Sequence, residues 1–151
     1  MATDMTPPLP ARERRPVDLP ASTAQAVWRG MRFTCPRCGD APLFAHFLKP
    51  MPICPGCGQD WSRQRADDFP AYISMLVTGH LLAPLIIGLE LAFAPPVGVL
   101  AALVVPLAMM FMLGLLQPAK GGVIAMQWWL GMHGFNRERP IEGHPRRNDL
   151  V

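Results

Sequence analysis

The sequence predicts an α-helical membrane hairpin of two transmembrane helices, with a small N-terminal zinc-ribbon module and a C-terminal interfacial helix. Two observations support this fold class. All four cysteines of the 151-residue chain lie in two similar short motifs. Shortly after the second motif, Glu90 is the only residue between Pro70 and Leu116 whose side chain is charged at neutral pH. The chain therefore combines a metal-binding pattern with an apolar block that is long enough to cross a bilayer twice.

The predicted organisation, in chain order, is a disordered tail over 1–21, a short helix and a zinc ribbon over 22–66, a transmembrane hairpin over 67–116, an interfacial helix over 117–135 and a second disordered tail over 136–151. Residues 1–20 hold five prolines and an arginine-rich run, without the continuous apolar segment of a secretory signal peptide. Ser22 or Thr23 can cap the short helix, which carries Val27, Trp28 and Met31 on one side.

The two cysteine motifs predict a structural zinc site. They read Cys35-Pro-Arg-Cys-Gly39 and Cys54-Pro-Gly-Cys-Gly58, with fifteen residues between the inner cysteines. This spacing lets two tight turns present four thiolates to one zinc ion. The predicted ligands of that single ion are Cys35, Cys38, Cys54 and Cys57. The apolar residues expected to cover the site form a core too small for the module to fold without metal. They are Leu43, Phe44, Phe47, Leu48, Ile53 and Trp61.

Two alternatives concern the same motifs. His46 lies between them and can replace a cysteine as ligand, although four cysteines already complete a tetrahedral shell. A single C-x-x-C pair can be redox-active, which would make the protein a thiol oxidoreductase that acts through Cys35 and Cys38. The duplication of the motif at ribbon spacing favours structural zinc.

The apolar block predicts two membrane-spanning helices, at about 70–93 and 97–116. Asp67 and Asp68 before a proline are typical of a helix start, and Ala94-Pro95-Pro96 is expected to break the helix. Of the 14 Lys and Arg residues, nine precede the block and five follow it, so both termini are expected in the cytoplasm. Each flank carries a net charge of only about +2, which argues against nucleic acid as a partner.

Two ionisable residues inside the hairpin are candidate functional residues. His80 is expected near the bilayer midplane, level with Met110 and Met112 of the second helix, and a histidine near methionines can bind copper or haem iron. The alternative is a neutral histidine that forms a hydrogen bond within the hairpin or to a partner helix. Glu90 lies near the outer end of the hairpin, where it can anchor the helix at the interface or belong to a proton or cation path.

The last predicted helix is interfacial. Pro118 and Lys120-Gly121-Gly122 are expected to end the second transmembrane helix. The uncharged stretch from Val123 to Phe135 is too short to span a bilayer. Trp128 and Trp129 are expected at the level of the lipid headgroups, where they can help to hold the zinc module on the membrane.

Several of these strings together resemble the bacterial family known as domain of unknown function 983, over roughly residues 28–135. They are Cys35-Pro-Arg-Cys-Gly39 with Pro42-Leu43-Phe44, the second knuckle with Gln59-Asp60-Trp61, Asp68-Phe-Pro70-Ala71, Gly79-His80 with Pro84-Leu85 and Glu90, Gln117-Pro118-Ala119-Lys120-Gly121, and Met132-His133-Gly134-Phe135. Phe69 departs from the glycine usual in relatives. The resemblance implies an inner-membrane protein with a cytoplasmic zinc ribbon and two membrane helices, whose genes often lie among those for cytochrome c oxidase and its assembly factors.

The chain is too short for a full enzyme domain in addition to these parts, so we predict that it is not an enzyme. We expect a membrane-anchored zinc-ribbon accessory protein in the bacterial inner membrane. Its expected partners are membrane lipid and another inner-membrane protein, and the resemblance implies a role in respiratory oxidase assembly. The alternatives are copper or haem handling through His80 and the methionines, and thiol redox chemistry.

Overall fold

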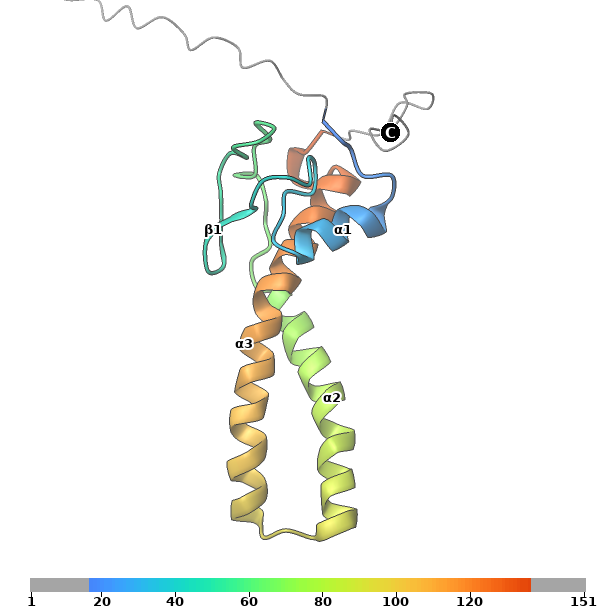
Figure 1. Cartoon of the computed structure of the whole chain (residues 1–151), viewed down its shortest axis with the longest axis vertical. Helices are drawn as coiled ribbons and strands as arrows, with labels where there is room; N and C mark the ends of the chain where they lie inside the picture. Colours follow the sequence, from blue (N-terminus) through green and yellow to red (C-terminus); the bar gives the residue numbers. More distant parts are fainter. Residues whose placement is uncertain (1–16, 137–151) are drawn as a thin grey trace, which may run out of the picture.

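The helical hairpin consists of α2 (Phe69–Phe93) and α3 (Val97–Leu130), joined by a short link over 94–96. The computed structural model describes residues 17–136, with a small module at the open end of this hairpin (Figure 1). Both helices are long and apolar enough to cross a membrane, by length and composition. Asp68 occupies the N-cap position of α2, as predicted, but its side chain makes no capping hydrogen bond.

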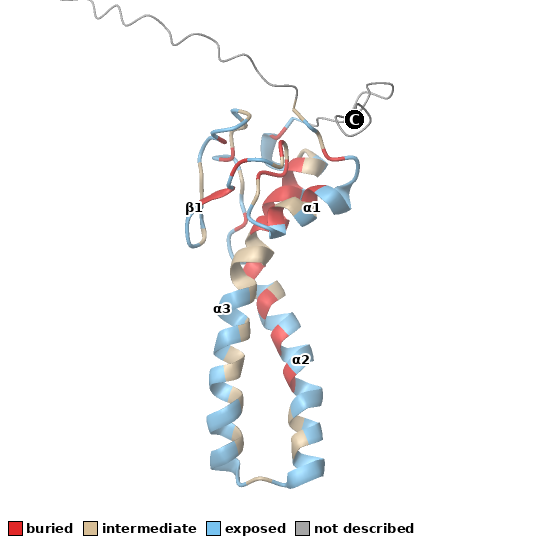
Figure 2. Cartoon of the chain, viewed as in Figure 1, coloured by how far each residue is buried: buried red, intermediate tan, exposed pale blue. Residues whose placement is uncertain are grey.

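A narrow stripe of α2 packs against α3. Its buried residues recur every four positions, as one face of an α-helix requires, and they are Pro70, Ser74, Thr78 and Leu82. Figure 2 shows this stripe on the side of α2 that faces α3, with exposed residues elsewhere on the helix. The Ser74 hydroxyl donates a hydrogen bond to the Pro70 carbonyl, whereas the buried Thr78 hydroxyl oxygen has no partner among the described residues.

The prediction of a separate interfacial helix over 117–135 is wrong. α3 does not end at Leu116 but continues through Pro118 and Gly121-Gly122 to Leu130, where Gly131 in the left-handed conformation ends it. Residues 121–125, Gln127 and Trp128 are buried in the module, so the Trp128 indole is not at a membrane surface. A short 3-10 turn, η1 (Met132–Gly134), and the buried Phe135 follow.

Gly30 and Gly121 allow α1 (Thr23–Met31) to cross α3 with their backbones in close contact. A Cβ atom on Gly121 would lie 2.0 Å from the carbonyl oxygen of Gly30, and a Cβ on Gly30 would lie 2.3 Å from that of Gly121. Only two glycines can make this contact. The residues that predicted a helix break are therefore the site where two helices meet.

Residues 17–21, which were predicted to belong to a disordered tail, pack against α1 and the core. The Ser22 hydroxyl accepts a hydrogen bond from the Gln25 N–H and caps α1, as predicted. Asp18 forms an ion pair with Arg29 at 3.2 Å, and Val17 and Leu19 pack on the core, so 17–21 are not a disordered tail. The predicted tails over 1–16 and 137–151 lie outside the described residues.

The strands are short. β1 (Phe44–His46) and β2 (Lys49–Pro50) form an antiparallel pair. Of the predicted ribbon core, Leu43, Phe44 and Trp61 are buried, but Phe47 and Ile53 are exposed. The difference arises because α1 and α3 supply most of the remaining core, including Ala26, Val123, Ile124 and Trp128.

Candidate metal centre

Two turns of the same construction present the four cysteines. In the first, the Gly39 N–H donates to the Cys35 carbonyl at 2.8 Å and the Cys35 N–H donates to the Ala41 carbonyl at 2.7 Å. In the second, the Gly58 N–H donates to the Cys54 carbonyl and the Cys54 N–H donates to the Gln59 carbonyl, both at 2.9 Å. Gly39 and Gly58 have φ of +74° and +72°, which explains the glycine in each motif.

Each cysteine turn is flanked by two residues that pair in an antiparallel β-bridge. Thr34 pairs with Pro42 across the first turn, and Ile53 pairs with Asp60 across the second. The sequence between and around the turns is thus folded into small hairpins, which fix the direction of the cysteine side chains. This arrangement is that of a zinc-ribbon-like module.

The sulfur atoms are positioned for one metal ion. The Sγ atoms of all four cysteines lie within 4.8 Å of one another. The Sγ atoms of Cys35 and Cys57 are 3.8 Å apart, as are those of Cys38 and Cys54. A zinc ion with sulfur ligands at about 2.3 Å in a tetrahedron separates neighbouring sulfurs by about 3.8 Å. The residues present therefore fit a zinc ion, and they are the four that the sequence predicted.

Mutual hydrogen bonding shifts the pKa values of the thiols in opposite directions, whereas burial raises all of those that are shifted. Cys35, Cys38 and Cys54 are buried and Cys57 is partly exposed. The hydrogen bond with Cys35 lowers the pKa of the Cys38 thiol, and the same contact, with burial, raises the pKa of Cys35. For Cys57 the contact with Cys35 lowers the pKa, but the contact with Cys38 and burial raise it, to about 11. A metal ion would replace these shared protons.

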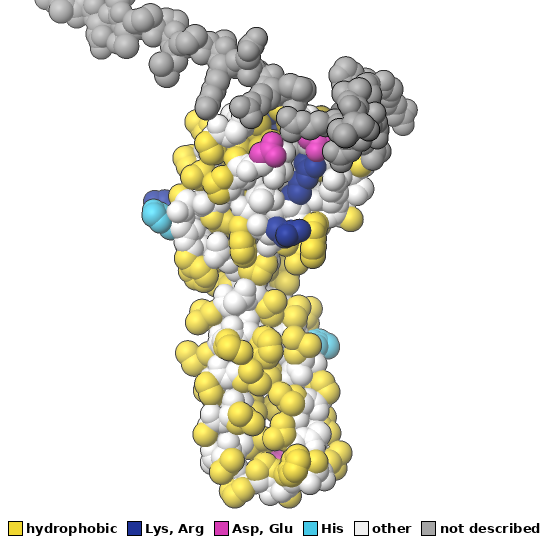
Figure 3. Space-filling view, in the orientation of Figure 1, with side chains coloured by type: hydrophobic (Ala, Val, Ile, Leu, Met, Phe, Trp, Pro, Cys, Tyr) yellow, Lys and Arg dark blue, Asp and Glu magenta, His cyan; other side chains and the backbone are white. Residues whose placement is uncertain are grey.

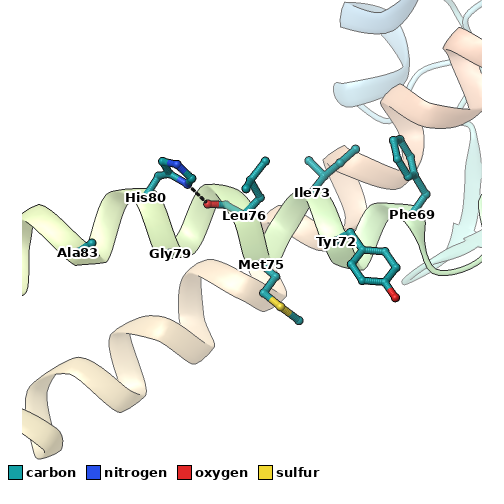
Figure 4. A pocket seen from close by; sticks show the side chains of 8 residues that line it. All are labelled: Phe69, Tyr72, Ile73, Met75, Leu76, Gly79, His80 and Ala83. Carbon is teal, nitrogen blue, oxygen red and sulfur yellow. Dashed lines mark hydrogen bonds between the residues drawn. The ribbon is translucent and has the colours of Figure 1, made fainter.

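Other predicted ligands lie elsewhere. His46 is exposed on β1 and does not belong to the group of cysteines. His80 lies on the exposed side of α2, where its Nδ1 is 2.8 Å from the Leu76 carbonyl oxygen. Figure 4 shows the His80 ring on the side of α2 away from α3, so it does not face Met110 and Met112 of that helix. Glu90 is exposed near the closed end of the hairpin.

The family model named Protein of unknown function (DUF983) matches residues 44–128, which is more than half of the chain. The chain belongs to this family. The match includes the second cysteine turn, α2 and α3 as far as Trp128, whereas Cys35, Cys38 and α1 lie outside it. No curated protein and no solved structure matches the chain.

In this DUF983 protein the metal centre is joined to α3 by an aromatic cluster. Trp61, three residues after the second turn, packs edge-on against Trp128 with ring centroids 6.1 Å apart and against Phe135 at 5.9 Å. Trp61 and Trp128 are almost fully buried. Trp61 was predicted in the ribbon core, and this is confirmed, whereas Trp128 was predicted at the membrane surface.

One side chain that sequence reasoning missed completes this junction. The Gln127 amide accepts from the Arg65 N–H at 3.1 Å and donates to the Arg65 carbonyl at 2.5 Å. It therefore satisfies both backbone groups of the strand-like segment that leads from the metal centre into α2. A signal for this contact is present in the sequence: Gln127 is a single polar residue in an apolar stretch, next to Trp128 and Trp129. A polar side chain in such a stretch is expected to have a hydrogen-bond partner.

Proposed function

We propose that this protein is a non-catalytic, membrane-anchored accessory protein whose hairpin binds another inner-membrane protein, while the four-cysteine module carries structural zinc on the cytoplasmic side. Four sulfur ligands close the coordination shell and leave no position for a substrate, which supports a structural role for the metal. The burial of three of the four thiols is also unfavourable for a thiol oxidoreductase.

The observation that carries the partner proposal is a shallow, wide-open apolar groove on the outer side of α2. It is lined by Phe69, Tyr72, Ile73, Met75, Leu76, Gly79, His80 and Ala83 (Figure 4). All of these residues belong to α2, so the groove is open on the side away from α3. Within it, Gly79 has no heavy atom near the place where a Cβ would be, and this leaves room for a side chain of a second helix.

His80 supplies the groove with a polar group. Its Nδ1 is bonded to the Leu76 carbonyl, which leaves Nε2 available for a hydrogen bond to a partner helix. In a membrane such a hydrogen bond adds orientation and about 0.6 kcal/mol on average. An apolar surface with a glycine and a few polar groups, here His80 and the Tyr72 hydroxyl, is typical of contacts between transmembrane helices.

The experiment is affinity purification of the full chain from mild detergent, with quantification of co-purifying proteins. The Gly79→Leu variant fills the groove and should lose the partner. Gly114→Leu is the matched control, because Gly114 is a glycine of α3 that likewise has open space around it. The proposal is refuted if the two variants retain the same proteins in the same amounts.

Copper or haem handling through His80 is the second candidate. In its favour, the hydrogen bond between Nδ1 and the Leu76 carbonyl orients the ring as in many metal-binding histidines. Against it, Met110 and Met112 do not line the groove. His80→Gln separates the two functions. Under the accessory function, partner recovery and oxidase level stay near normal. A severe oxidase defect with normal protein abundance and normal zinc content would favour metal handling.

A further inference from the structure

The β1–β2 turn has an unusual composition. Phe47 and Leu48 are the two residues between the paired positions His46 and Lys49. Two-residue hairpin turns favour glycine, asparagine and aspartate, because these residues tolerate positive φ and water. Here Leu48 has a φ of +59° and the Phe47 side chain is 59% exposed. A strained turn with an exposed Phe47 and a partly buried Leu48 indicates a surface that covers it.

The turn lies on the side of the module from which the hairpin extends. Phe44 at the start of β1 packs near Gly121, since a Cβ there would be 3.4 Å from the Phe44 ring. The strand leads from this contact to the turn. In Figure 1 the β1–β2 turn projects along the long axis toward the hairpin and ends close to the level at which α2 begins.

Side chains of different kinds are layered along the same axis. On the face in Figure 3, hydrophobic side chains cover most of the hairpin and the lower rim of the module, and the Lys and Arg side chains lie above this rim. Acidic side chains lie near the top of the module, and one is visible near the closed end of the hairpin. Lys49 is exposed and directly follows the turn. Asp67 and Asp68, also exposed, precede α2 and reduce the net positive charge of this level. The order from apolar to cationic matches that from the acyl chains to the phosphates of a bilayer.

We propose that the β1–β2 turn is a second membrane contact, in which Phe47 and Leu48 enter the interfacial layer of the bilayer and Lys49 lies at the lipid phosphates. This inference rests on the proposed membrane anchoring of the hairpin. A bilayer is the occupant because the apolar rim is continuous with the apolar surface of the hairpin, at the level where α2 and α3 leave the module. The module is thereby seated on the membrane at a point away from the helices.

The test measures the depth of position 47 in the full-length, zinc-loaded protein reconstituted in phosphatidylcholine–phosphatidylglycerol vesicles. A fluorescent amino acid is incorporated at position 47, and its quenching is compared for lipids with a nitroxide on the headgroup, high on the acyl chain or deep in the acyl chain. Ile53 is the matched control, because it is equally exposed at 61% but directly precedes the second cysteine turn, which lies away from the hairpin. Leu103 of α3, also exposed, reports whether the hairpin is in the bilayer.

We expect several-fold stronger quenching at position 47 than at position 53, greatest with the shallow acyl nitroxide, and a decrease when Lys49→Glu is added. Quenching at 47 no greater than at 53 would overturn the inference, and the turn would then be left for a protein partner. If position 103 is quenched by the deep nitroxide in the same sample, the membrane hairpin stands although the turn contact fails. If position 103 is not quenched, the proposed anchoring itself is wrong.

Discussion

Replacement of Gly121 by alanine should break the crossing of α1 and α3. The new methyl group would lie 2.0 Å from the Gly30 carbonyl oxygen and 2.8 Å from its carbonyl carbon, and both atoms belong to the backbone. No side-chain rotation relieves this overlap, so α1 has to move outward and lose contact around Ala26 and Ala125, both fully buried. Overpacking of this kind costs about 1–3 kcal/mol and occasionally more.

Two glycines of the same helix provide a graded comparison. Gly114→Ala adds a methyl group to open space, and alanine is favoured over glycine in a helix by about 1 kcal/mol, so this variant should be neutral or more stable. At Gly122 the new methyl group would meet the flexible Met31 side chain at 3.1 Å, and we expect an intermediate effect. For Gly121→Ala the overlap is with backbone atoms at 2.0 Å, so the cost lies at the upper end of the overpacking range, and about 2 kcal/mol should remain lost after the helix preference of about 1 kcal/mol is subtracted.

The assay is denaturant unfolding of the module in detergent micelles, followed by the emission of the buried Trp61 and Trp128. The order of unfolding free energies should be Gly114→Ala, then Gly122→Ala, then Gly121→Ala, from the most to the least stable. Equal stability of the Gly121 and Gly114 variants would refute the close crossing of the two helices.

Three further predictions concern the metal centre, the junction and the hairpin. Elemental analysis should find one zinc per chain, and Cys38→Ser should abolish both zinc binding and folding of the module. Because Cys35 and Cys57 have raised pKa values, at least two protons compete with the metal. The apparent zinc affinity measured by chelator competition should therefore fall by at least about 100-fold for each unit that the pH is lowered below 8. Gln127→Leu leaves the N–H and carbonyl of Arg65 without partners and should lower the unfolding free energy by about 1–3 kcal/mol, whereas Met126→Leu at the exposed neighbouring position should not. Topology reporters fused to the two ends should both report the cytoplasm, and opposite locations would show a single crossing.

The cysteine cluster and the two apolar helices could be predicted because their signals are local. Motif spacing determines which thiols can meet, and the length of an uncharged stretch determines where a long helix can form. The turn glycines 39 and 58 were predictable for the same reason, since each lies next to the cysteine whose turn it completes.

The continuation of α3 was not predictable from local signals. The proline and the two glycines between 118 and 122 have low helix preference, which favours a break. Their role depends on Gly30, some 90 residues earlier, and on the packing of α1, which the sequence does not display. The same long-range packing explains why Phe47 and Ile53 are absent from the core and why residues 17–21 are ordered.

Because α3 has no interruption between Val97 and Leu130, it is a single rod of about 51 Å at 1.5 Å per residue. One end lies at the hairpin link and the other is fixed to the metal module by Gln127 and Trp128. A tilt of about 10° would move a point about 40 Å along such a rod by about 7 Å. Under the proposed membrane anchoring, any protein that changes the inclination of this helix in the bilayer would therefore displace the cysteine cluster outside it, without a conformational change in the module.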